Sequence, residues 1–171
     1  MEKKDLKPAG VFKYFEEICQ VPRPSKKEEK MIAYLKAFGA KHNLETKVDE
    51  AGNVLIKKPA TPGKENLQTV VLQSHIDMVC EKNNDVQHDF LTDPIETEID
   101  GEWLKAKGTT LGADNGIGVA TELAILADDS IEHGPLECLF TVDEETGLTG
   151  AFALKEGFMN GDILLNLDSE D

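Results

Sequence analysis

Positive charge and cysteine are both scarce in this sequence, and each scarcity excludes a class of protein. Only 18 Lys and Arg residues stand against 33 Asp and Glu in 171 residues, which gives a formal net charge of −15 at pH 7. This charge repels phosphate backbones and anionic lipids, so we expect neither nucleic acid nor a membrane surface as a partner. The three cysteines, at positions 19, 80 and 138, form no Cys-x-x-Cys unit. This pattern favours reduced thiols in a cytoplasmic protein over a disulfide framework.

Long apolar runs are absent as well. No stretch reaches 18 apolar residues, and the polar N-terminus, residues 1–5, is not followed by an apolar signal segment. We therefore expect neither a membrane span nor export. Hydrophobic residues make up 40% of the chain, which is enough for one α/β domain with its own core.

Apolar periodicity predicts helices and strands in alternation. Helical spacing covers residues 11–19, 26–42 and 116–127, and Ser25 is placed to cap the second of these helices. Strand patterns cover residues 53–57, 68–73, 136–142 and 162–167. Residues 95–99 and 103–106 flank Asp100-Gly101, a dipeptide suited to a tight hairpin turn.

Acidic side chains and one imidazole stand where the apolar segments end. Open α/β sheets bind ligands beyond the carboxyl ends of their strands, so we expect these side chains to converge on one site. The candidate residues are His75, Asp77, Asp114, Glu144, Glu145 and Asp168.

Each candidate has an ordinary structural alternative when it is taken alone. His75 and Asp77 could be satisfied strand residues, and Asp114 or Asn115 could simply cap the helix that follows. The Glu144-Glu145 pair could form an exposed acidic turn, and Asp168 could begin an acidic tail. The glycines at positions 108, 112, 116 and 118 lack the Gly-Lys-Ser/Thr ending of a phosphate loop, which disfavours a nucleotide site.

Taken together, the candidates indicate a metal-dependent hydrolase. Nitrogen and oxygen donors of this kind suit zinc, manganese or cobalt. Three consecutive carboxylates after an apolar strand repel one another unless a cation neutralises them. Neighbouring side chains leaving a strand point in different directions, so one glutamate can bind metal while the other serves as general base. Asp77 can orient the imidazole of His75.

Four segments resemble one family of peptidases. Residues 74–83, 100–118, 133–137 and 166–170 are similar in order and spacing to the aminoacyl-histidine dipeptidases, also called cytosolic non-specific or beta-Ala-His dipeptidases. The form Ala-Asp-Asn-Gly-Ile-Gly at residues 113–118 resembles this branch more closely than its tripeptidase or desuccinylase relatives. The resemblance runs over nearly the whole chain.

The resemblance implies both a fold and a set of residue roles. It implies a zinc-peptidase-like mixed β-sheet flanked by helices, a three-layer α/β/α arrangement, with two zinc ions that manganese or cobalt could replace. Asp114 would bridge the ions, His75 and Asp168 would complete one of them, and Glu145 would bind the other. Glu144 would be the general base and Asp77 would orient His75. A cis peptide bond between Asp114 and Asn115 is also implied.

The resemblance further implies that the family's full-length members are longer. We expect residues 1–171 to be the N-terminal part of the catalytic domain, with the lid and dimerisation domain and the C-terminal catalytic segment absent and the fold therefore incomplete. The whole protein would be a homodimer that hydrolyses dipeptides of the Xaa-His type and others, whereas the fragment would be inactive. The alternatives are an aminotripeptidase, an N-deacylase relative, a non-catalytic metal-binding module and an acidic interaction domain.

Overall fold

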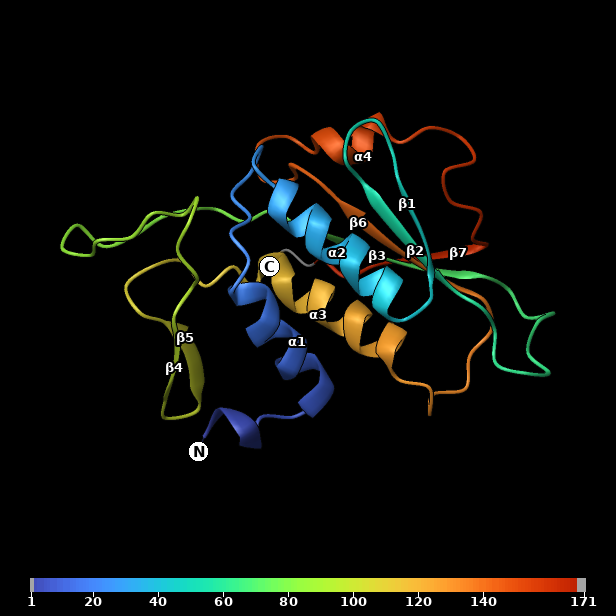
Figure 1. Cartoon of the computed structure of the whole chain (residues 1–171), viewed down its shortest axis with the longest axis horizontal. Helices are drawn as coiled ribbons and strands as arrows, with labels where there is room; N and C mark the ends of the chain where they lie inside the picture. The colour runs from blue at the N-terminus through green and yellow to red at the C-terminus, as the bar shows by residue number, and fades with distance from the viewer. Residues whose placement is uncertain (1, 169–171) are drawn as a thin grey trace.

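A five-stranded mixed sheet forms the centre of the computed structural model, which describes residues 2–168 (Figure 1). The strand order is β1-β2-β6-β3-β7. The strands are β1 (Glu45–Val48), β2 (Val54–Lys58), β3 (Val70–His75), β6 (Leu136–Thr141) and β7 (Ile163–Asn166). β3 runs parallel to both β6 and β7, whereas β2 runs antiparallel to β6. The segments that follow β3, β6 and β7 therefore leave the sheet at one common edge.

Helices cover the two faces of this sheet unequally. α1 (Ala9–Cys19), α2 (Glu29–Lys41) and α3 (Ala113–Ala127) lie on one face (Figure 1). On the other face, Leu154, Phe158 and Met159, which follow α4 (Thr149–Ala153), pack on Leu55, Val71 and Leu139. The expected mixed α/β sheet flanked by helices is confirmed, and in residues 2–168 its second helical layer consists of one short helix and a loop. No helix of this part of the chain is long and apolar enough to cross a membrane.

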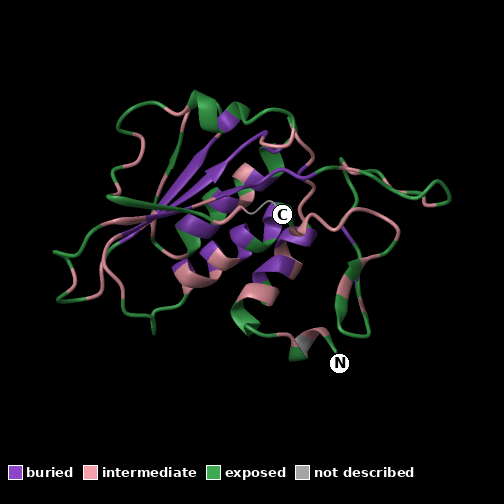
Figure 2. Cartoon of the chain, turned by 180° about the vertical axis from the view of Figure 1, so that it is seen from behind, coloured by how far each residue is buried: buried purple, intermediate pink, exposed green. Residues whose placement is uncertain are grey.

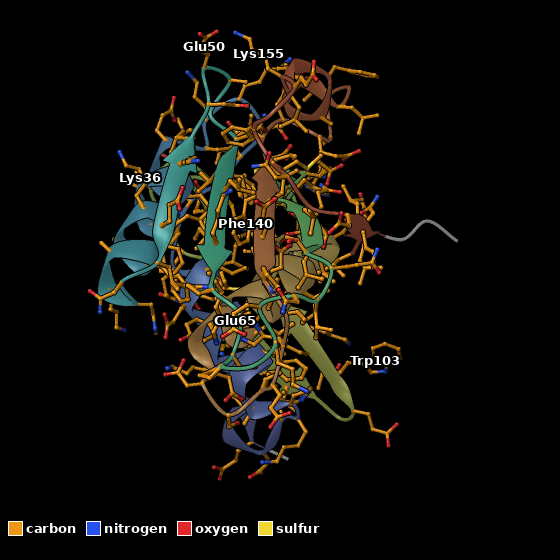
Figure 3. All side chains as sticks on the ribbon, turned by 90° about the vertical axis from the view of Figure 1, so that its right-hand side faces the viewer. Lys36, Glu50, Glu65, Trp103, Phe140 and Lys155 are labelled. Carbon is orange, nitrogen blue, oxygen red and sulfur yellow. The ribbon has the colours of Figure 1, made fainter. Side chains whose placement is uncertain are left out.

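Alternation along the strands divides the core into two parts. In β6, Cys138 and Phe140 face the large core beneath the three helices, whereas Leu139 faces the smaller cluster on the opposite side. All three side chains are at most 1% exposed. Figure 2 shows the central strands and the inner faces of the helices as buried, and Figure 3 places Phe140 in the middle of the sheet. Burial on both faces agrees with the nearly unbroken apolar sequence of the strand.

The predicted hairpin is present as a separate two-stranded sheet. It consists of β4 (Thr97–Asp100) and β5 (Trp103–Ala106). Gly101 has a φ of +63°, a conformation that glycine adopts without steric cost. The side chain of Trp103 projects away from the fold and is 71% exposed (Figure 3).

Several local predictions were incomplete or wrong. The short elements η1 (Lys3–Asp5), β1 and α4 were not predicted, because each is brief and polar or small in sequence. Ser25 does not cap α2, which begins at Glu29; its hydroxyl donates instead to a carboxylate oxygen of Asp77, at 2.7 Å. The helix-cap alternative for Asp114 and Asn115 is also wrong. Gly112 occupies the N-cap position of α3, and the backbone at 114 and 115 is non-helical.

Candidate metal centre

His75 lies at the centre of the predicted site. It is the last residue of β3, and its side chain is only 1% exposed. Its Nε2 atom lies 3.2 Å from a carboxylate oxygen of Asp114, 3.8 Å from one of Glu144 and 3.9 Å from one of Asp168. The ends of β3, β6 and β7 and the start of α3 thus bring together side chains that are up to 93 positions apart in the sequence.

Two sets of side chains offer donor atoms that lie within 4.8 Å of one another at this edge. One set is His75, Asp114 and Glu145, and the other is His75, Glu144 and Asp168. His75 belongs to both sets, but a single Nε2 atom can bind only one ion. An aspartate has two carboxylate oxygens, so Asp114 is the kind of residue that can reach two ions.

Asp77 is buried beneath the site and holds several parts of it in place. Its carboxylate lies 3.3 Å from Nδ1 of His75 and accepts hydrogen bonds from the backbone N–H groups of Glu144 and Glu145. Burial alone raises the pKa of Asp77, but the hydrogen bonds from His75, from the backbone of Glu144 and from Ser25 outweigh it and lower the pKa to about 2. The ionised carboxylate therefore holds the imidazole with Nε2 facing the acidic groups.

The acidic groups shift the pKa of one another and of His75. Burial by itself lowers the pKa of His75, but the hydrogen bond and charge of Asp77, with help from Asp114 and Glu144, raise it to about 9. Burial is also the main cause that raises the pKa of Glu144 and of Glu145, and repulsion from neighbouring carboxylates adds to it. This edge of the sheet is short of positive charge, which is the electrostatic condition under which a divalent cation binds well.

The segment that carries Asp114 has unusual backbone geometry. The peptide bond between Asp114 and Asn115 is cis, which confirms the expectation drawn from the resemblance. The side chain of Asp114 is 71% exposed, in contrast to the buried His75 beside it. A cavity of about 290 Å³ opens beside Asp114 and Glu145, with Val79 and Leu111 among its lining residues. The site is therefore closed on the side of the sheet and open on the side of Asp114.

A second buried acidic cluster, formed by Glu28, Asp77 and Asp143, was missed in the sequence. Its oxygens accept hydrogen bonds from within the chain. Glu28 accepts from the backbone N–H of Asp143 at 3.0 Å, and Asp143 accepts from the hydroxyls of Thr146 and Thr149, each at 2.6 Å. We interpret this cluster as structural support for the turn that presents Glu144 and Glu145. No local pattern could have found it, because Glu28 lies 115 positions before Asp143.

Residues 71–168, the stretch that contains all six candidates, match the family model described as peptidase family M20/M25/M40. The chain belongs to this family. Its sequence is 51% identical over 170 residues to the cytosol non-specific dipeptidase of Escherichia coli (strain K12). That alignment covers 99% of this chain and 35% of the relative.

Two solved peptidase structures have the same fold. The aminoacylhistidine dipeptidase from Vibrio alginolyticus matches with a TM-score of 0.96 and 56% identity over 99% of this chain and 35% of that one. The aminopeptidase PepT from Bacillus cereus matches with a TM-score of 0.80 and 26% identity, over 95% of this chain and 43% of that one. The chain thus spans about a third of the length of the two dipeptidases that it resembles.

The residues present fit the metal ions that M20 metallopeptidases use. One imidazole nitrogen and four carboxylates converge at the carboxyl edge of the sheet, and imidazole and carboxylate are common ligands of zinc. Asp77 behind His75 supplies the carboxylate support that a ligating imidazole commonly has.

Proposed function

We propose that the whole protein hydrolyses dipeptides, including those of the Xaa-His type, at a centre of two zinc ions with a glutamate as general base. The observation that carries this proposal is the convergence of His75, Asp114, Glu144, Glu145 and Asp168 at one edge of the sheet, over a buried Asp77. The likeness to the dipeptidases of Escherichia coli and Vibrio alginolyticus supports the choice of substrate class.

We assign each side chain one role. His75 and Asp168 would hold one ion, Glu145 would hold the other, and Asp114 would bridge the two. Manganese or cobalt could replace zinc at these ligands. When bound, the ions would supply Lewis acidity toward the scissile carbonyl and a lowered pKa for water.

Glu144 would move the protons of the reaction. Its raised pKa suits a group that accepts a proton from the attacking water and then passes it to the leaving amine. Asp77 would keep the imidazole of His75 in one tautomer and orientation throughout. The carboxylate of Glu144 also lies near Asp168 and His75, so a role as metal ligand is the alternative that an experiment must separate from the role as base.

We further propose that residues 1–171 are the N-terminal part of the catalytic domain and have negligible dipeptidase activity by themselves. In the proposed assignment, the described residues give one ion three ligands but give the other only Asp114 and Glu145. Robust zinc-dependent turnover by the purified 171-residue chain would contradict this.

The expectation of a homodimer for the whole protein stays a prediction. A cytoplasmic location is supported by three free cysteines and by the name of the Escherichia coli relative.

The decisive experiment is Glu144→Gln in the whole protein. Loss of a general base should lower kcat by about 10²- to 10⁴-fold while both zinc ions remain bound. Zinc content measured by atomic emission separates the two roles, because loss of zinc from the variant would make Glu144 a ligand instead. The matched control is Glu132→Gln, an exposed glutamate in the loop before β6, at the opposite end of that strand; it should change neither kcat nor zinc content.

The same assays decide among the alternatives. Zinc binding without hydrolysis of any dipeptide would indicate a metal-binding module, and no zinc binding at all would favour an interaction domain. Faster turnover of tripeptides or of N-acyl amino acids would place the protein with those relatives.

A further inference from the structure

Arg23 is a buried cation that is not among the site residues described above. It lies between α1 and α2 and is only 2% exposed. Its Nη1 atom donates to the backbone carbonyls of Ile76 and Asp77, each at 3.1 Å, and its Nη2 atom donates to the carbonyl of Gly112 at 2.6 Å. The guanidinium therefore joins the segment just after His75 to the segment just before Asp114.

The backbone of Arg23 is attached to the same region. Its carbonyl accepts a hydrogen bond from the N–H of Met78 at 3.2 Å, and the next residue, Pro24, forms an isolated parallel bridge with Met78. Main chain and side chain together fix the position of the guanidinium relative to the end of β3. The planar fork of an arginine can hold several carbonyls at fixed angles, which the single ammonium of a lysine cannot do.

Two glycines make room for the guanidinium. A Cβ atom at Gly112 would lie 2.6 Å from Nη2 of Arg23, and one at Gly116 would lie 2.7 Å from the same atom. Both distances are too short for any side chain to fit without displacing the guanidinium. The glycines around Asp114 therefore have a second reason to be glycine, besides the backbone freedom that the φ of +66° at Gly112 requires.

We propose that Arg23 is a positioning residue of the metal centre, which sets the distance between His75 and Asp114. These two side chains lie 3.2 Å apart, and 38 residues separate them in the sequence. Hydrogen bonds of Thr110 with Val79 and Glu81 also join the two segments, but the guanidinium bonds closer to the site, to Ile76, Asp77 and Gly112. Support of this indirect kind typically changes metal affinity by about 10- to 100-fold. The inference rests on the proposed metal-dependent function.

The experiment uses the whole protein and compares its Arg23→Met and Arg23→Lys variants with the unsubstituted form. Calorimetric titration with Zn²⁺ should show an affinity lower by about 10- to 100-fold in Arg23→Met, and a smaller loss in Arg23→Lys. The visible absorption of bound Co²⁺, which reports ligand geometry, should change in both variants. Arg23→Lys keeps the charge and decides the question alone if Arg23→Met does not fold.

Lys58→Met is the matched control. Lys58 is also a buried cation that donates to backbone carbonyls, those of Ile125 and Asp128, but it lies at the far end of α3. This control should lower the free energy of unfolding without changing zinc affinity or the Co²⁺ spectrum. A purely structural role for Arg23 would make its variants behave like the control.

The outcomes separate this inference from the proposed function. Unchanged zinc affinity and Co²⁺ spectrum in the folded Arg23 variants would overturn the inference and leave the metal centre intact. If the unsubstituted protein bound no zinc, the metal centre itself would be contradicted, and the positioning role with it.

Discussion

β6 and β7 flank the same strand, β3, and both run parallel to it, yet they differ sharply in burial. Every residue of β6 is buried. In β7, by contrast, Ile163, Leu164 and Leu165 are 38%, 49% and 48% exposed. Both strands are strongly apolar in sequence, so hydrophobicity alone did not decide their burial. Their burial depends on their position in the sheet, because β6 lies between two strands and beneath helices, whereas β7 is at the edge.

The candidate residues that follow these two strands also differ in the hydrogen bonds that hold them. Glu144 and Glu145, beyond β6, are held by backbone hydrogen bonds to the buried Asp77. Beyond β7, the backbone N–H of Asp168 donates to the side chain of Asn166, two residues earlier, at 2.7 Å. The backbone of Glu144 is thus held by a residue 67 positions away, whereas this hydrogen bond of Asp168 lies within its own segment; the preceding Leu167 donates to the backbone carbonyl of Gln73 in β3, at 2.8 Å.

The largest expected effect tests the difference in burial directly. Phe140→Ala in β6 should lower the free energy of unfolding by about 3–5 kcal/mol, because it leaves a cavity in a filled core. Leu164→Ala in β7 should cost about 1 kcal/mol, because half of that side chain already contacts solvent. Urea unfolding of both variants measures the two values. Equal losses would mean that β7 is covered in solution, and the contrast between the strands would then be wrong.

The next effect concerns His75, at the end of the strand that β6 and β7 share. Because its pKa is raised to about 9, the imidazole is protonated at pH 7, and zinc must displace that proton. Zinc affinity should therefore rise about tenfold per pH unit from pH 7 toward pH 9 and then level off. Calorimetry at several pH values, in buffers of different ionisation enthalpy, counts the protons released. A flat profile over this range would contradict a protonated His75.

The smallest effect concerns Glu122 of α3, which is fully buried and lies on the β6 side of β3. Its carboxylate accepts a hydrogen bond from the hydroxyl of Ser74 at 2.6 Å. Burial raises the pKa of Glu122 well above its usual range, so the folded state favours the neutral acid. The stability that this group contributes is complete below its unfolded pKa and is lost as the pH rises toward the folded pKa.

Glu122→Gln removes this dependence because the amide cannot ionise. Relative to the unsubstituted protein, the unfolding free energy of the variant should therefore increase as the pH rises from 4 to 8. Urea unfolding at each pH measures the gain, with Glu132→Gln as the exposed control that should show no such trend. If the unfolding free energy of the variant fell relative to that of the unsubstituted protein as the pH rose, Glu122 would be ionised in the folded protein.

Much of the fold and of the candidate site could be predicted from local patterns. The strands that became β2, β3, β6 and β7 were predicted within two residues of their ends, and so was the hairpin around Gly101. The cis bond at Asp114 and the likeness to the aminoacyl-histidine dipeptidases followed from motifs in the sequence. Ser25 shows where the local approach failed: its spacing to Glu28 resembled a helix cap, but a carboxylate 52 positions away is its partner.

The sequence by itself determined which segments are apolar, where acidic groups and an imidazole follow them, and to which family the chain belongs. Only the tertiary structure decided that β6 is buried while β7 is exposed, that Asp77 holds the backbone of Glu144 and Glu145, and that Arg23 fills the space left by two glycines. The physical reason is that strand and helix patterns report side-chain periodicity along the chain. Hydrogen bonds and burial at the site depend instead on which segments the sheet order brings together.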